Sequence, residues 1–137
     1  MEAGLEHLRR GTARHVDAML VVAEPYYRSL EAAARTCSLA NELKIPFVRV
    51  VANKVRNEDD FAAIESFCSQ HDLEIIGSVP YDDSMMEAER QAKAPIDFDP
   101  NSAGVRSVQA IAGEVEKMQA ALKTVVGRPG DEAHSTN

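Results

Sequence analysis

Three short apolar runs along the chain have the pattern of buried β-strands. They cover residues 17–24, 47–53 and 74–81, and their interiors are almost free of charged side chains. Their starts lie roughly 30 residues apart, which is the length of one strand plus one crossover helix. The pattern therefore predicts strands that are joined by helices and buried on both faces.

The two segments between these runs have the period of amphipathic helices. Apolar residues recur at steps of three and four, first at Leu30, Ala33, Ala34, Cys37, Ala40 and Leu43 and then at Phe61, Ile64, Phe67 and Cys68. We expect Pro25 to start the first helix and Asn57 or Glu58 to cap the second. The order strand, helix, strand, helix, strand predicts an α/β fold with a three-stranded parallel sheet and right-handed crossover helices.

The rest of the chain adds helices around this unit and ends in a polar tail. We expect a helix at 2–14, a short helix at 83–92 capped by Asp83 and Ser84, a loop at 94–101 and a long helix at 102–126. The tail, residues 127–137, is expected to be disordered. The 137 residues suffice for one domain, which we place at residues 1–126.

The last helix and the sheet both present apolar surface that needs a cover. The helix has apolar residues at heptad-like steps, at Val108, Ile111, Val115, Met118, Leu122 and Val125. It either docks on the chain's own sheet or pairs with another chain. A sheet of three strands also leaves open edges and has few helices to cover its faces. This shortfall suggests that further strands are missing or are supplied by another chain.

The charge of the chain argues against two classes of partner. The formal net charge of −7 opposes attraction to nucleic acid or to an anionic membrane. No apolar run approaches the roughly 20 residues that cross a bilayer, and the charged start of the chain does not fit a signal peptide. We therefore expect a cytoplasmic protein. Cys37 and Cys68 lie in no paired metal-binding motif, and we expect buried small hydrophobes rather than metal ligands.

The end of the second strand carries the candidate binding chemistry. Asn53 and Lys54 end the apolar run, at the carboxyl edge where open α/β sheets bind ligands. The Asn53 amide offers a donor and an acceptor, so it can read a nucleotide base. Taken alone, Asn53 also fits an ordinary turn at a strand end. No Gly-x-x-x-x-Gly-Lys-Ser/Thr phosphate loop occurs in the chain.

Five segments, taken in order, form a set that is more specific than any one of them. They are Met-Glu-Ala-Gly at 1–4 with Glu-His at 6–7, Leu-Val-Val at 20–22 with Glu-Pro at 24–25, Val-Val-Ala-Asn-Lys-Val at 50–55, Gly-Ser-Val-Pro-Tyr-Asp at 77–82 and Asp-Phe-Asp-Pro-Asn-Ser at 97–102. This set resembles CooC-type ATPases, MinD/ParA-like members of the deviant P-loop NTPases. The resemblance implies the incomplete carboxyl-terminal part of a P-loop NTPase fold. It also implies a family role in ATP-dependent insertion of nickel into carbon monoxide dehydrogenase.

The resemblance assigns a base site to residues of this chain. Asn53 would bind the adenine amine and a ring nitrogen, and the Lys54 stem would pack beside the base or ribose. Pro80 and Tyr81 would form the other wall of the base slot, and Asp82 or Asp83 would contact the ribose or base. The resemblance assigns no residue of this chain to catalysis or to a metal.

Other parts of the family's site have weak counterparts or none. Glu2 and His7 are candidates for a switch segment or dimer interface, or else are exposed residues of the first helix. The phosphate loop, the Mg²⁺-positioning acids and the family's Cys-x-Cys are absent from this sequence. Without phosphate clamps and a metal ion, phosphoryl transfer lacks positioning and charge stabilisation. We predict that this chain alone neither hydrolyses ATP nor binds it appreciably, so ATP and Mg²⁺ belong to a complete protein.

The expected partners follow from these gaps. They are a missing amino-terminal half or a second copy, together with carbon monoxide dehydrogenase. Two other interpretations remain open. One is a non-catalytic protein-interaction module derived from the same fold, which binds through a sheet edge or the last helix. The other is a flavodoxin-like or response-regulator-like domain, whose acidic pocket would come from Glu24, Asp82 and Asp83.

Overall fold

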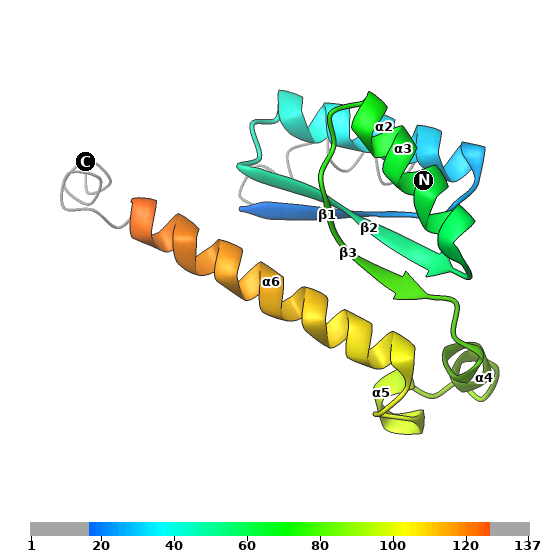
Figure 1. Ribbon diagram of the computed structural model, residues 1–137. Coiled ribbons are helices and arrows are strands. Elements are labelled where there is room, and N and C mark those ends of the chain that lie inside the picture. The colour runs from blue at the N-terminus through cyan, green and yellow to red at the C-terminus, as the bar shows by residue number, and fades with distance from the viewer. Residues whose placement is uncertain (1–16, 127–137) are drawn as a thin grey trace.

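A three-stranded parallel sheet lies at the centre of the molecule, as the sequence predicts. The computed structural model describes residues 17–126, and Figure 1 shows their arrangement. The strands are β1 (Ala18–Ala23), β2 (Phe47–Val55) and β3 (Ile75–Pro80), in the order β1-β2-β3. The helices α2 (Tyr27–Glu42) and α3 (Glu58–Gln70) connect them and lie together on one face of the sheet.

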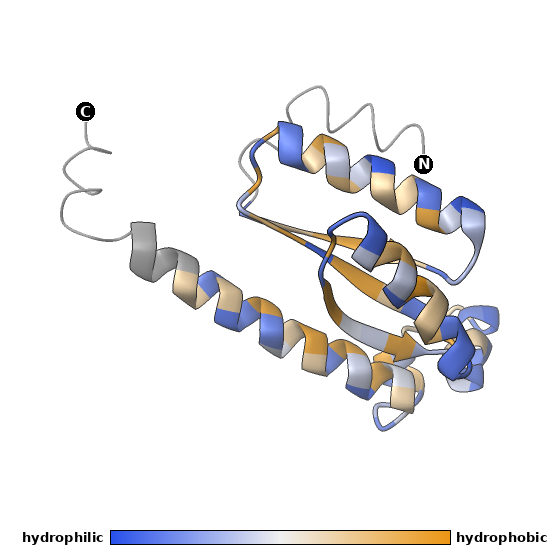
Figure 2. Ribbon diagram, turned by 45° about the horizontal axis from the view of Figure 1, so that its top comes forward, coloured by the Kyte–Doolittle hydropathy of each residue, from blue (hydrophilic) through white to orange (hydrophobic). Residues whose placement is uncertain are grey.

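The main core fills the space between the sheet and these two helices. Its buried side chains come from alternate strand positions and from one stripe of each helix: Val21, Ala23, Val50, Ala52, Leu30, Ala33, Cys37, Ile64 and Cys68. Figure 2 shows the hydrophobic residues concentrated along the strands. Burial raises the pKa of Cys37 to about 11, so this thiol is not a reactive thiolate at neutral pH. Both cysteines are buried and free, as predicted.

The opposite face of the sheet is covered over only part of its width. The helix α6 (Ala103–Val126) packs on β3, where Val51, Val79 and Ile111 form a small buried cluster. The last helix therefore docks on the chain's own sheet. On β1, Leu20 and Val22 are 36% and 53% exposed. The prediction of burial on both faces is wrong for β1, because no described element covers this side of it.

The contact stripe of α6 is narrower than its heptad-like pattern. It begins at Val105 and runs through Ile111 to the partly buried Val115. Val108, which the pattern placed in the stripe, is 48% exposed. The helix packs mainly on the edge strand β3 and reaches Val51 of β2, so only a narrow stripe of its surface is covered. The side chains of residues 122 and 125 lie outside the described part of the helix.

The start of α3 agrees with the predicted cap, whereas the starts of α2 and α4 differ from their predictions. α2 begins two residues after Pro25, and no side chain caps it. Asn57 caps α3 as predicted, because its Oδ1 accepts a hydrogen bond from Asp60 N–H at 2.9 Å. α4 (Asp83–Arg90) is capped by Asp82, one residue before the predicted cap.

The predicted loop at residues 94–101 contains one helical turn, α5 (Pro95–Phe98). A proline suits the first helical position because the N–H that it lacks would have no partner there. The helix predicted at residues 2–14 and the tail predicted at 127–137 fall outside the described residues. Within residues 17–126, no helix is long and apolar enough to cross a membrane.

Candidate functional site

β2 does not stop at Asn53 but continues through a distortion to Val55. Its register with β3 shifts between Ala52 and Val55, so that Asn53 and Lys54 lie opposite a single residue. Lys54 has a φ of 57°, in the left-handed region. The predicted strand end is wrong by two residues, because the chain forms a bulge there instead of leaving the sheet.

The left-handed conformation of Lys54 differs in kind from the others in the structure. Three more non-glycine residues have positive φ, namely Lys44, Asp72 and Ala92. Each follows the cap at the end of a helix, where a left-handed residue lets backbone N–H groups close the last turn. Of the four, Lys54 alone lies inside a strand. A conformation that costs roughly 1–2 kcal/mol and persists inside a sheet suggests a functional edge.

The Lys54 side chain reaches the end of the neighbouring strand. Its Nζ lies 3.3 Å from Oε2 of Glu24, which directly follows β1. The two side chains are 39% and 33% exposed, so solvent screens the pair and its contribution is modest. Lys54 also borders a hollow of about 500 Å³ on the side of α4. The cation therefore lies between two strand ends and next to open space.

Pro80 and Tyr81 lie beside this bulge. The Tyr81 N–H donates to the Val55 carbonyl at 2.9 Å, which joins the end of β3 to the end of β2. Asn53 is half-buried, and its side-chain amide forms no hydrogen bond with any residue in 17–126. The structure thus brings Asn53, Lys54, Pro80 and Tyr81 to one carboxyl edge. Their contact with a base stays a prediction.

Arg56 is a residue of this edge that the sequence reasoning missed. Its guanidinium carbon lies 4.5 Å from the centroid of the Tyr81 ring, in a cation–π contact. The Tyr81 side chain is 36% exposed. The signal that could have found Arg56 is its place just after the strand, two residues beyond Lys54. A planar ligand at this edge would meet a guanidinium as well as a phenol ring.

Asp82 is held by backbone donors. Its Oδ1 accepts from Ser84 N–H at 2.9 Å, and its Oδ2 accepts from Gly104 N–H at 2.8 Å. These hydrogen bonds, the one from Gly104 above all, lower the pKa of Asp82 below its ordinary value. Asp82 therefore joins the end of β3 to the starts of α4 and α6. The ribose or base contact predicted for it stays a prediction.

Gly104 permits the close approach on which this contact depends. A Cβ at this position would overlap Met85 Sδ and would lie 2.9 Å from Asp82 Oδ2. Just before it, the buried Ser102 hydroxyl accepts from Val105 N–H at 3.2 Å and caps the first turn of α6. The start of α6 is thus fixed to the loop that carries the proposed base wall.

Some predicted site residues are not brought together. Glu2 and His7 lie outside the described residues. Among residues 17–126, no group of three or more His, Cys, Asp or Glu side chains is placed to hold a metal ion. The acidic pocket of a response-regulator-like domain is therefore not formed in this part of the chain. Glu24 instead pairs with Lys54, and Asp82 pairs with backbone N–H groups.

Sequence comparison finds relatives that are similar to most of this chain. No protein-family profile matches the chain. It is 44% identical over 103 residues to an uncharacterized ATP-binding protein of Methanocaldococcus jannaschii, covering 75% of this chain and 40% of that protein. It is 38% identical over 100 residues to the carbon monoxide dehydrogenase accessory protein CooC of Rhodospirillum rubrum, covering 73% of this chain and 37% of CooC. The chain thus spans about two fifths of the length of these relatives.

Solved structures with the same arrangement include two MinD proteins. MinD of Aquifex aeolicus matches with a TM-score of 0.65 at 19% identity, over 77% of this chain and 46% of that protein. MinD of Pyrococcus horikoshii, solved with Mg-ADP, matches with a TM-score of 0.64 at 16% identity, over 75% and 42%. These likenesses show the fold: the parallel sheet and its helices match part of the larger MinD structure.

Proposed function

We infer from this partial homology to MinD-like and CooC-like P-loop ATPases that the carboxyl edge of β2 and β3 is the adenine-binding part of an ATP site. The bulge supports this most directly, because it places a left-handed Lys54 beside the end of β3, together with an Asn53 amide that has no hydrogen-bond partner within residues 17–126. In this assignment Asn53 binds the adenine amine and a ring nitrogen. Lys54 lies beside the base or ribose, and Pro80 with Tyr81 forms the opposite wall.

The phosphate-binding part of the proposed site comes from outside this sequence. The 137 residues contain no phosphate-loop motif. Leu20 and Val22 are exposed on the edge strand β1 and form an apolar surface on which a further element can pack. We propose that the part with the phosphate loop docks there. It would belong either to a longer protein that contains this sequence or to a second chain.

Calorimetric titration with Mg-ATP tests this division of the site. The chain alone should show negligible binding, because base contacts without phosphate and metal contacts lack most of the electrostatic interaction. Adding the part of Rhodospirillum rubrum CooC that lies outside the matched residues should restore binding. Micromolar affinity of the chain alone would contradict the proposal, as would a complemented pair that assembles and still binds no ATP.

The Asn53→Ala variant tests the base contact in the complemented protein. It should weaken ATP binding about tenfold, which corresponds to the loss of a base-reading hydrogen-bond pair. Inosine triphosphate lacks the exocyclic amine, so its affinity should fall less in the same variant. Asn41→Ala removes an exposed amide from α2 and should change neither affinity. Equal effects of Asn53→Ala and Asn41→Ala would remove Asn53 from the site.

We further propose that the ATP site serves nickel insertion into carbon monoxide dehydrogenase. The similarity to CooC supports this role, while the Methanocaldococcus jannaschii relatives support ATP binding alone. A Rhodospirillum rubrum strain without CooC offers the test. The complemented protein should restore carbon monoxide dehydrogenase activity at limiting nickel. Failure to restore it, with ATP binding intact, would limit the function to ATP binding for another client.

A non-catalytic interaction module is the second candidate. The exposure of Leu20 and Val22 on β1 favours it, because such a surface suits a protein partner whether or not nucleotide binds. A module should be a stable monomer or dimer that melts cooperatively alone. Half of a split site should instead gain stability and solubility when the complementing part is added. Thermal melting with and without that part separates the two candidates.

A further inference from the structure

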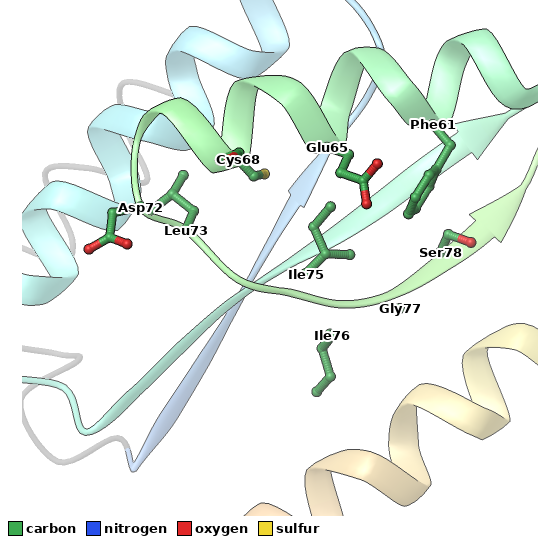
Figure 3. A pocket seen from close by; sticks show the side chains of 10 residues that line it. Phe61, Glu65, Cys68, Asp72, Leu73, Ile75, Ile76, Gly77 and Ser78 are labelled. Carbon is green, nitrogen blue, oxygen red and sulfur yellow. The ribbon is translucent and has the colours of Figure 1, made fainter.

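We propose that the groove between α3 and the outer edge of β3 is a docking site for a positively charged, extended segment of another protein. Figure 3 shows part of this groove, with side chains from α3 and from the β3 segment along it. Two hollows of about 580 and 510 Å³ form it, and they share Phe61, Glu65 and Ser78. The groove therefore extends along α3 from its first turn to the turn that follows its last residue.

The outer edge of β3 is open to an added strand. β3 is an edge strand, and nothing within residues 17–126 pairs with its outer side. Sheet edges are commonly protected by charged side chains or prolines. β3 is Ile-Ile-Gly-Ser-Val-Pro, with no charge and with its proline only at the last position. Its outward backbone groups can therefore pair with an extended peptide, as in strand addition.

The floor of the groove suits apolar side chains. Phe61, Leu73 and Ile75 line it, and all three are partly buried against the main core. Gly77 and Ser78 add little bulk on the β3 side. An extended chain directs alternate side chains to opposite faces. Every second residue of an added strand would therefore lie on this floor.

The rim of the groove is acidic. Glu58, Glu65 and Asp72 line it, and none of them pairs with a cation within residues 17–126. Glu58 and Glu65 are two helical turns apart on one side of α3, about 10 Å along its axis. Among the described lining residues the one cation is Arg56, which stacks on Tyr81 at the end of the groove. The charge therefore favours lysine or arginine in the partner.

The same charges argue against a second copy of this chain as the occupant. Two β3 edges that paired about a two-fold axis would bring the acidic rims of both grooves toward each other. The net charge of −7 on each copy adds to this repulsion. A basic segment of another protein avoids both penalties and gains charge complementarity.

Fluorescence anisotropy with a labelled peptide of seven alternating lysine and valine residues tests the proposal on the full chain. Seven extended residues span about 23 Å, which covers the roughly 10 Å from Glu58 to Glu65 and extends past Glu65 toward Asp72. The peptide should bind, and Glu65→Lys should weaken binding about fivefold through the loss and reversal of one surface charge contact. Glu116→Lys makes the same charge change on an exposed position of α6 and should leave the affinity unchanged. Circular dichroism confirms that both variants are folded.

Two more probes separate a bound strand from general charge attraction. N-methylation of either all valine or all lysine amides blocks one edge of the peptide, and one of these two peptides should lose binding. A matched glutamate–valine peptide should bind Glu65→Lys better than it binds the unaltered chain. The proposal is overturned if both methylated peptides bind unchanged, or if Glu116→Lys weakens binding as much as Glu65→Lys. Concentration-dependent dimerisation that Glu65→Lys strengthens would assign the groove to a second copy instead.

Discussion

The two faces of the sheet come from the same three strands and yet are covered to different degrees. On the face covered by α2 and α3, the side chains of Val50 in β2 and of Ile64 in α3 are at most 1% exposed. Under α6, the buried cluster is confined to the side of β3, and Val22 on β1 is 53% exposed. Strand composition does not explain this, because both faces carry apolar residues at alternate positions. The difference lies in the helices of residues 17–126: two of them cover one face, and one covers part of the other.

The largest effect should come from emptying the well-covered face. Ile64→Ala should lower the free energy of unfolding by about 3 kcal/mol. The Ile64 side chain is fully buried, so its loss leaves a cavity between α3 and the sheet. Leu20→Ala removes a comparable side chain from the other face and should cost less than about 1 kcal/mol. Urea denaturation measures both. Equal costs would show that the β1 surface is covered in solution, and the contrast between the faces would disappear.

The stability of the α6 side should depend on the close approach of Gly104 to Met85 and Asp82 more than on a broad core. Gly104→Ala should cost about 2 kcal/mol, because a Cβ there would overlap Met85 Sδ and displace the start of the helix. Gly113→Ala is the matched control in the same helix, since a Cβ there meets nothing within 4 Å. It should stabilise by up to about 1 kcal/mol through helix propensity. A neutral Gly104→Ala would show that α6 is not anchored at this loop.

The anchor of α6 should also weaken in acid. Hydrogen bonds from Gly104 and Ser84 lower the pKa of Asp82 in the folded protein, so its carboxylate stabilises the fold above the ordinary value of 3.8. That contribution is lost as the pH falls through 3.8 toward the lower folded value. Asp82→Asn should therefore cost about 1 kcal/mol at pH 7 and progressively less below pH 4. Asp83→Asn, at the exposed neighbour, should cost less than Asp82→Asn at pH 7.

An effect no larger than that of Asp82→Asn should come from the strained bulge. Lys54→Gly and Lys54→Ala both remove the contact with Glu24, so they differ only in how well they tolerate a left-handed backbone. The glycine variant should be more stable by about 1 kcal/mol. At Arg49, in the regular part of β2, the order should reverse, with glycine less stable than alanine by about 0.5 kcal/mol. The same order at both positions would show that the bulge is not held in solution.

The sequence predicted most of the fold because strand and helix periods are local signals. All three strands lie within two residues of their predicted bounds, and both crossover helices start within two residues of their predicted starts. The exposure of Val22 could not be predicted, since Val22 has the same residue type as the buried Val21 and only the number of covering helices separates them. The composition of the strands carries no information on that number.

The sequence predicted which residues lie together at one edge of the sheet but not their geometry, and their role in binding stays a prediction. Asn53, Lys54, Pro80 and Tyr81 do share one edge, because parallel strands end on the same side. The bulge was missed because no glycine marks it, and a lysine seldom adopts positive φ. Arg56 was missed because its contact with Tyr81 joins two strand ends that are distant in the sequence. The role of Asp82 depends on a glycine 22 residues away, which no local pattern reveals.

The hydrogen bond from Gly104 to Asp82 supplies a built-in spectroscopic probe. An amide proton that is donated to a carboxylate resonates downfield and exchanges slowly with solvent, and both properties change when the acceptor is protonated or moves away. The donor stands on α6, and the acceptor stands on the loop directly after Tyr81. One peak in a nitrogen–proton correlation spectrum would therefore follow two separate events. It would report the ionisation of one carboxyl group, and any displacement of the tyrosine loop when a ligand is added.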